Sequence, residues 1–120
     1  MPRLIFLDDD RIQHLLLRKL FQIHLPNWDS EFFENAQDAK GWLSQNEVDL
    51  IISDLNLGSE IGWKFVSEIQ KFSQAPVVFL TGNISPLDQQ KKAQVDQVKL
   101  ILEKPLEESG FIQILDVLKA

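Results

Sequence analysis

Short apolar runs alternate with longer amphipathic segments along the chain. A strand buried on both faces is a nearly continuous apolar run, whereas a helix that covers a sheet repeats its apolar residues every three or four positions. Four runs are strongly apolar, and the second is weaker and bracketed by acids, which indicates a strand near a sheet edge. The predicted strands cover residues 4–7, 31–34, 50–54, 77–80 and 99–103.

The segment after the first run predicts a helix that begins at Asp10 and ends before Pro26. Asp10 is a favourable N-cap, Gln13 stands at capping-box spacing from it, and proline cannot continue a helix. Leu17 and Phe21 form an apolar pair that we interpret as additional core packing, with a partner-docking face as the alternative. The residues predicted to face the sheet recur at helical spacing: Ile12, Leu15, Leu16, Leu20 and Ile23.

Four further helices are predicted after the remaining runs. Asn35 caps the first, Gly62 begins the second, and Ser85 with Pro86 begins a third that has few apolar residues and should be the most loosely packed. The last covers residues 107–119. Their predicted inward residues are Ala36, Ala39, Trp42 and Leu43, then Phe65, Val66, Ile69 and Phe72, then Phe111, Ile114, Leu115 and Leu118.

The alternation of strands and helices predicts a single α/β domain over residues 1–120. Short connections between alternating elements imply a doubly wound, five-stranded parallel sheet with helices on both faces. Ligand sites in such sheets lie at the carboxyl ends of the strands. The residues that directly follow the apolar runs are therefore the candidates for function.

Composition and charge narrow the class of protein. With 18 acidic and 12 basic residues the net charge is -6, which opposes direct contact with nucleic-acid phosphates. The absence of cysteine excludes disulfides and thiolate metal sites, and no apolar run is long enough to span a bilayer. We therefore expect a soluble, cytoplasmic protein that binds neither nucleic acid nor membrane.

Carboxylates follow two of the predicted strands. Asp8, Asp9 and Asp10 come directly after the first run, and Asp54 ends the third. Acids gathered at one edge of a sheet repel one another unless a cation joins them. Because the donors are all oxygens, they suit Mg²⁺, with Mn²⁺ possible, rather than zinc.

A hydroxyl and an ammonium follow the last two strands. Thr81 can donate a hydrogen bond to a phosphoryl oxygen, and Lys104 can neutralise another. An aspartate beside such groups can itself attack phosphorus and form an acyl phosphate. Asp54 stands where this nucleophile belongs, so phosphate is the ligand that these side chains predict.

These motifs resemble the receiver domain of two-component response regulators over residues 3–118. The resemblance rests on Leu-Asp-Asp-Asp at 7–10, Ser-Asp-Leu-Asn-Leu at 53–57, Gly62 eight positions after Asp54, Thr81-Gly82 and Lys104-Pro105. It implies the flavodoxin-like, CheY-like (βα)5 fold with strand order 2-1-3-4-5. It also implies that Asp54 accepts a phosphoryl group from a histidine kinase or histidine phosphotransfer protein, and that the chain is no enzyme beyond its own phosphorylation and dephosphorylation.

The resemblance further implies a ligand set for Mg²⁺. Asp9 and Asp54 would bind the ion directly, together with the backbone carbonyl of Asn56. Asp8 would act largely through water. A site of few carboxylates, waters and phosphate oxygens is typical of this ion.

The remaining site residues match the family's phosphate contacts. Thr81 and Lys104 are expected to hold the phosphoryl oxygens, the Lys104–Pro105 bond to be cis, and the small Gly82 to leave room for the donor. Ile101 stands where the family commonly has Tyr or Phe. Output in the family usually involves inward rotation of this aromatic ring on the fifth strand, and isoleucine cannot make that movement. We therefore expect the signal to leave through Thr81, its loop and the sparse helix beyond, toward an effector protein or a second copy.

Two further stretches of the sequence depart from the family's pattern. Leu57-Gly58 replaces the family's usual Met-Pro pair, and residues 94–100 lack its usual Gly-Ala.

Three other functions share some of these sequence features. A phosphatase of the haloacid dehalogenase type needs an acid where Asn56 stands, and a flavodoxin-like cofactor binder needs a glycine-rich first loop rather than three acids. The third alternative is a binding module with the receiver fold that is no longer phosphorylated, although all five site residues are present.

Overall fold

The computed structural model describes residues 2–57 and 61–119, so Gly58 of the Leu57-Gly58 pair lies outside the described residues. The strands are β1 (Arg3–Leu7), β2 (Asp29–Phe33), β3 (Leu50–Asp54), β4 (Val77–Thr81) and β5 (Val98–Glu103). The helices are α1 (Arg11–His24), α2 (Ala36–Leu43), α3 (Gly62–Ile69), α4 (Pro86–Gln94) and α5 (Glu108–Lys119). Within these described ranges no helix is long and apolar enough to cross a bilayer.

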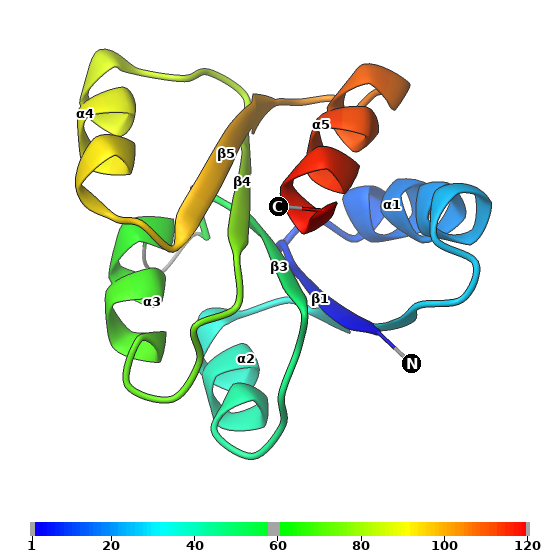
Figure 1. The fold of residues 1–120 in the computed structure, drawn as a ribbon, viewed down its shortest axis with the longest axis horizontal. Coiled ribbons are helices and arrows are strands. Elements are labelled where there is room, and N and C mark those ends of the chain that lie inside the picture. The colour runs from blue at the N-terminus through cyan, green and yellow to red at the C-terminus, as the bar shows by residue number, and fades with distance from the viewer. Residues whose placement is uncertain (1, 58–60, 120) are drawn as a thin grey trace.

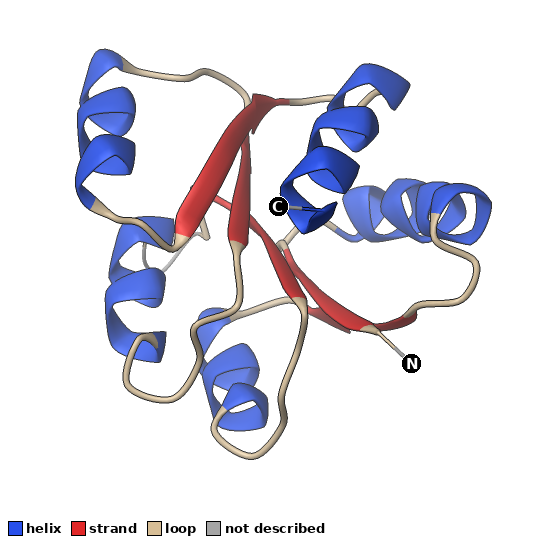
Figure 2. Cartoon of the chain, viewed as in Figure 1, coloured by secondary structure: helices blue, strands red, loops and turns tan. Residues whose placement is uncertain are grey.

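The strands form one parallel sheet in the order β2-β1-β3-β4-β5 (Figure 1). Helices α1 and α5 cover one face, and α2, α3 and α4 cover the other (Figure 2). Each face has its own apolar core, because side chains alternate between the two faces along each strand. The predicted doubly wound, flavodoxin-like fold with strand order 2-1-3-4-5 is confirmed.

The predicted inward face of α1 is wrong. Leu17 and Phe21 are buried, whereas four of the five residues assigned to the sheet are exposed by 47% to 70%: Ile12, Leu15, Leu16 and Ile23. The ring of Phe21 packs edge-on against Phe6 and Phe111 and tilted against Phe32. Three aromatic contacts hold this side of the helix on the sheet, so the wider aliphatic stripe lies outside.

The other predicted elements shift only at their ends. β2 begins at Asp29 and lies at the sheet edge as expected, and β5 begins at Val98. α3 ends at Ile69, so the prediction that Phe72 faces inward is wrong, and this ring is 42% exposed. The remaining predicted inward residues of α2, α3 and α5 are buried or half-buried.

The helix predicted to pack most loosely, α4, is anchored mainly at its first turn. None of its nine residues, all of them described, is buried. Ser85 and Asp88 form a capping box, and the indole Nε1 of Trp63 donates to Asp88 Oδ1 at 3.0 Å. Trp63 also packs edge-on against Phe79, with ring centroids 4.9 Å apart.

Glycine is required where α3 begins. A Cβ on Gly62 would lie 2.6 Å from a ring carbon of Phe79 and 3.2 Å from the backbone oxygen of Asp54. The amide of Gly62 donates to Leu55 O at 2.7 Å, and Asn56 forms a β-bridge with Ile61. This close contact fixes the chain that follows Asp54.

Candidate functional site

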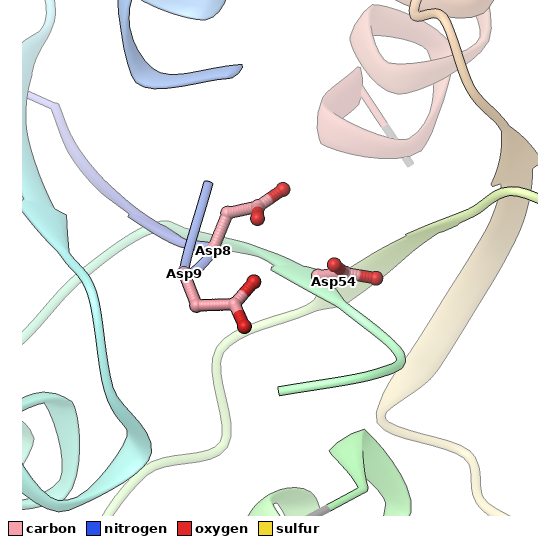
Figure 3. Close-up of side chains that lie close together, drawn as sticks. All are labelled: Asp8, Asp9 and Asp54. Carbon is pink, nitrogen blue, oxygen red and sulfur yellow. The ribbon is translucent and has the colours of Figure 1, made fainter. Parts of the chain in front are cut away.

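The predicted site acids meet at the carboxyl edge of the sheet. Leu7 of β1 lies beside Ser53 of β3, so the residues that follow in each strand come together. One oxygen from each of Asp8, Asp9 and Asp54 lies within 4.8 Å of the others (Figure 3). Asp9 is exposed, whereas Asp8 and Asp54 are buried.

Lys104 lies between the two buried carboxylates. Its Nζ is 3.0 Å from Asp8 Oδ2 and 3.0 Å from Asp54 Oδ2. Burial lowers the pKa of Lys104, but hydrogen bonds and charge from the two aspartates outweigh burial and raise it above 10.5. The lysine therefore enters the site as a cation at neutral pH.

Each buried carboxylate also accepts a backbone N–H. The amide of Asp10 donates to Asp8 Oδ1 at 2.9 Å, and the amide of Asn56 donates to Asp54 Oδ1 at 3.1 Å. Desolvation raises the pKa of Asp8 above 3.8, because its side chain has no exposed surface and the hydrogen bonds from Asp10 and Lys104 compensate only in part. A positive charge at this edge therefore favours its ionised form.

Thr81 ends β4, next to Lys104. The amide of Lys104 donates to Thr81 O at 2.8 Å, and the following Lys104–Pro105 bond is cis, as predicted. The Thr81 hydroxyl donates to Asn83 O at 3.2 Å and accepts from Asn83 N at 3.4 Å. This hydroxyl is thus held by its own loop, in a local turn. A Cβ on Gly82 would meet nothing within 4 Å apart from its chain neighbours, so there is open space beside it.

One residue at the site was not singled out from the sequence. His14 Nε2 lies 2.6 Å from the backbone oxygen of Asp8. Its spacing of three and seven residues from Leu17 and Phe21 places it on the buried side of α1, and this spacing was the available signal. The wider aliphatic stripe on the other side of α1 predicts a different inward face, on which His14 does not lie.

The cluster of three carboxylates and one ammonium is net negative and offers oxygen donors. Such donors fit a hard divalent cation better than zinc, which prefers nitrogen and sulfur. A buried acid beside a lysine can also act as a nucleophile toward phosphorus, with the ammonium ready to balance charge on phosphoryl oxygens. Asp10 contributes its backbone N–H and caps α1 by accepting from Ile12 N at 2.9 Å.

Several solved structures are similar to this chain. A receiver domain protein (CheY-like) from Methanospirillum hungatei JF-1 is 15% identical, with TM-score 0.87, over 99% of this chain and 94% of that one. A two-component response regulator from Clostridium difficile is 18% identical, with TM-score 0.86, over 99% and 96%. A response regulator protein from Burkholderia pseudomallei, described with a phosphorylated aspartic acid, calcium ion and citrate, is 16% identical, with TM-score 0.79, over 100% and 74%.

These likenesses show a shared fold. A comparison with curated proteins gives no match. A protein-family model described as the response regulator receiver domain matches residues 4–116, which is most of the chain. Together with the CheY-like fold, this match identifies the chain as a member of the response regulator receiver domain family.

Proposed function

We propose that this chain is the phosphoacceptor of a two-component phosphorelay in the cytoplasm. Asp54 would take a phosphoryl group from a phosphohistidine of a histidine kinase or histidine phosphotransfer protein, in a Mg²⁺-dependent reaction. The observation that carries this proposal is the position of Lys104 Nζ, 3.0 Å from both Asp8 and Asp54. The exposed Asp9 completes the same acidic cluster.

The proposed transfer needs few groups. An oxygen of the Asp54 carboxylate attacks phosphorus, the bond from phosphorus to the donor's imidazole nitrogen breaks, and that nitrogen keeps the electron pair. Lys104 balances charge on the phosphoryl oxygens, and the Thr81 hydroxyl donates to one of them after leaving Asn83. The chain changes only itself, so we propose no enzyme activity beyond its own phosphorylation and dephosphorylation.

The acidic cluster is the proposed metal site. Asp9 and Asp54 would bind Mg²⁺ directly with the Asn56 carbonyl, and Asp8 would act through water. When bound, the ion neutralises negative charge on the carboxylates and the phosphate. Mn²⁺ offers the same chemistry with oxygen ligands. The Burkholderia pseudomallei protein is described with both a phosphorylated aspartic acid and a calcium ion, which supports an equivalent arrangement here.

The exposed aliphatic side of α1 is the proposed docking surface for the donor protein. It comprises Ile12, Leu15, Leu16 and Ile23, and α1 begins three residues after Asp8. Leu16 and Leu20 also line a groove with Pro105 and Leu106, which follow Lys104. Apolar residues exposed together beside a site mark a protein contact more often than residues scattered singly.

Chemical phosphorylation tests the acceptor. Acetyl phosphate or phosphoramidate with Mg²⁺ should add the mass of one phosphoryl group to the intact protein. Asp54→Ala should abolish this addition, because Asp54 is the acid that we propose both to bind Mg²⁺ directly and to contact Lys104, whereas Asp8 would act through water. Asp96→Ala, which removes an exposed acid outside the site, is the matched control and should be labelled fully. Undiminished labelling of Asp54→Ala would refute the proposal.

A further inference from the structure

We infer that His14 is a positioning residue that holds the Asp8–Asp9 peptide and thereby sets the place of the Asp9 carboxylate for a divalent cation. The inference rests on the proposed function of the site, and it gives a role to a residue that the proposed phosphoryl transfer and metal binding do not use. The Nε2 atom of His14 lies 2.6 Å from the carbonyl oxygen of Asp8. A carbonyl oxygen only accepts, so Nε2 carries the proton and donates.

The carbonyl of Asp8 lies just beyond the reach of the sheet. The register of β1 with β3 stops at Leu7 and Ser53, and the amide of Asp8 still pairs with Phe33 O at 3.1 Å. The next peptide unit, which joins Asp8 to Asp9, is where the chain leaves the strand. His14 reaches back from α1 to hold this peptide.

The imidazole ring is itself held firmly. It packs edge-on against Phe6, with ring centroids 5.4 Å apart, and tilted against Phe32 at 5.5 Å. The backbone amide of His14 donates to Asp10 O at 3.3 Å, in the first turn of α1. A ring fixed by two aromatic neighbours and a helix loses little further freedom when it makes its hydrogen bond.

The three carboxylates of the cluster differ in how they are held. Those of Asp8 and Asp54 each accept from Lys104 and from a backbone amide. The carboxylate of Asp9 is exposed, so its place depends on the backbone that carries it. Rotation of the Asp8–Asp9 peptide would therefore displace Asp9 more than the other two acids, and His14 opposes this rotation.

Groups that orient metal ligands without touching the metal contribute measurably to affinity, by about 10-fold to 100-fold. His14→Phe keeps an aromatic ring of similar shape and removes the donor, so Mg²⁺ should bind about 10-fold more weakly. His14→Gln places an amide N–H near the former Nε2 and loses the ring. It should recover part of the affinity, because the inference assigns the effect to the donor.

The experiment titrates the full chain with MgCl2 alone and monitors binding by calorimetry or tryptophan fluorescence. His24→Phe is the matched control, since this second histidine of α1 stacks on Phe111 at 4.9 Å and has no contact with the acidic cluster among the described residues. It should bind Mg²⁺ like the wild type. Phosphorylation of His14→Phe by acetyl phosphate should reach the wild-type extent at saturating Mg²⁺ and need more Mg²⁺ for half of it.

The outcomes are distinct. Equal Mg²⁺ affinity of wild type and His14→Phe overturns the inference and leaves the proposed function intact. A loss in His14→Gln with none in His14→Phe shows that ring packing matters and the donor does not, which also overturns it. If His14→Phe does not fold, comparison of His14→Gln with His14→Ala decides, because only the former keeps a donor. A wild-type protein that binds no Mg²⁺ overturns the metal site, and the inference with it.

Discussion

At the scale of single residues, the site depends on how Lys104 shares its charge. Its ammonium contacts two carboxylates that together carry more negative charge than one cation balances. Removing one partner of a buried ion pair leaves the other desolvated and unpaired, which is costly. A divalent cation bound at the same acids would take over part of the lysine's role.

Lys104→Met should lower the free energy of unfolding of the metal-free protein by about 2 kcal/mol, the range of hydrogen bonds to charged groups. Saturating Mg²⁺ should make this loss smaller, because the cation balances the carboxylates that the lysine no longer contacts and therefore stabilises the folded variant more than the folded wild type. Urea unfolding with and without Mg²⁺ measures both. Lys99→Met, at an exposed position of β5, is the control and should change little. The same loss at both Mg²⁺ concentrations would contradict the expectation.

Most site residues could be predicted from the sequence, because parallel strands end at one edge and the residues after them must converge. Asp8, Asp54 and Lys104 meet on this ground alone. His14 could not be placed this way. Its contact with Asp8 depends on the rotation of α1 about its own axis, and the periodicity predicts the wrong inward side of this helix.

At the scale of elements, α1 shows why periodicity is not sufficient. Apolar residues occupy most of its circumference, so the helical period fits more than one inward face. The choice is made by the rings that Phe21 meets on β1, β2 and α5, and these contacts join residues far apart in the sequence. The apolar pattern did place the strands to within a few residues. The helix ends were also placed closely, because they carry local signals such as caps and prolines.

Two adjacent leucines on α1 test its orientation. Leu17→Ala should cost about 3 kcal/mol of unfolding free energy, because it leaves a cavity against the sheet. Leu16→Ala, at a position 47% exposed, should cost no more than about 0.5 kcal/mol. Chemical denaturation of the two variants makes the comparison. A larger loss for Leu16→Ala would mean that the stripe predicted from periodicity faces the core after all.

Asp88 joins α4 to α3. Partial burial raises its pKa, but hydrogen bonds from Trp63 and Ser85 outweigh burial and hold it below 3.8. A carboxyl whose pKa is depressed by folding stabilises the fold above its unfolded pKa, and this contribution is lost as pH falls through the folded value. The capped first turn of α4 should therefore persist at neutral pH and weaken only below pH 3.8.

Trp63→Phe removes one of the donors to Asp88, so the midpoint of the Asp88 titration should move upward. Carbon-13 NMR of the side-chain carboxyl follows this titration directly. Trp42→Phe is the control, because Trp42 lies on α2 and packs tilted against Phe33. An unchanged midpoint in Trp63→Phe would show that the indole contributes nothing to the acidity of Asp88.

At the scale of the whole molecule, the route of the signal depends on which segments can rearrange at a low cost in free energy. Ile101 is 9% exposed and lies beside Phe79 in the β4–β5 register, where it can stay in either state. A side chain with equal free energy in two states cannot shift their populations. The Thr81 hydroxyl, its loop and the unburied α4 are therefore the expected route toward an effector or a second copy.

Phosphorylation, or beryllofluoride as its mimic, should change backbone amide signals mainly over residues 82–99. The helix α1 should change little, because its aromatic contacts fix it on the sheet. Two-dimensional NMR of the isotope-labelled protein before and after treatment measures both regions. The Asp54→Ala variant under the same treatment is the control. The largest changes in α1, with residues 82–99 silent, would contradict this route.

The outward aliphatic side chains of α1 bear on how such a protein can diverge. Folding depends on the side that carries Leu17 and Phe21, whereas a partner would meet the opposite side. Substitutions at Ile12, Leu15 or Ile23 should thus leave the folded population nearly unaltered while altering which donor is recognised. After gene duplication, paralogous regulators built in this way could acquire separate partners through neutral steps, without passing through unstable intermediates.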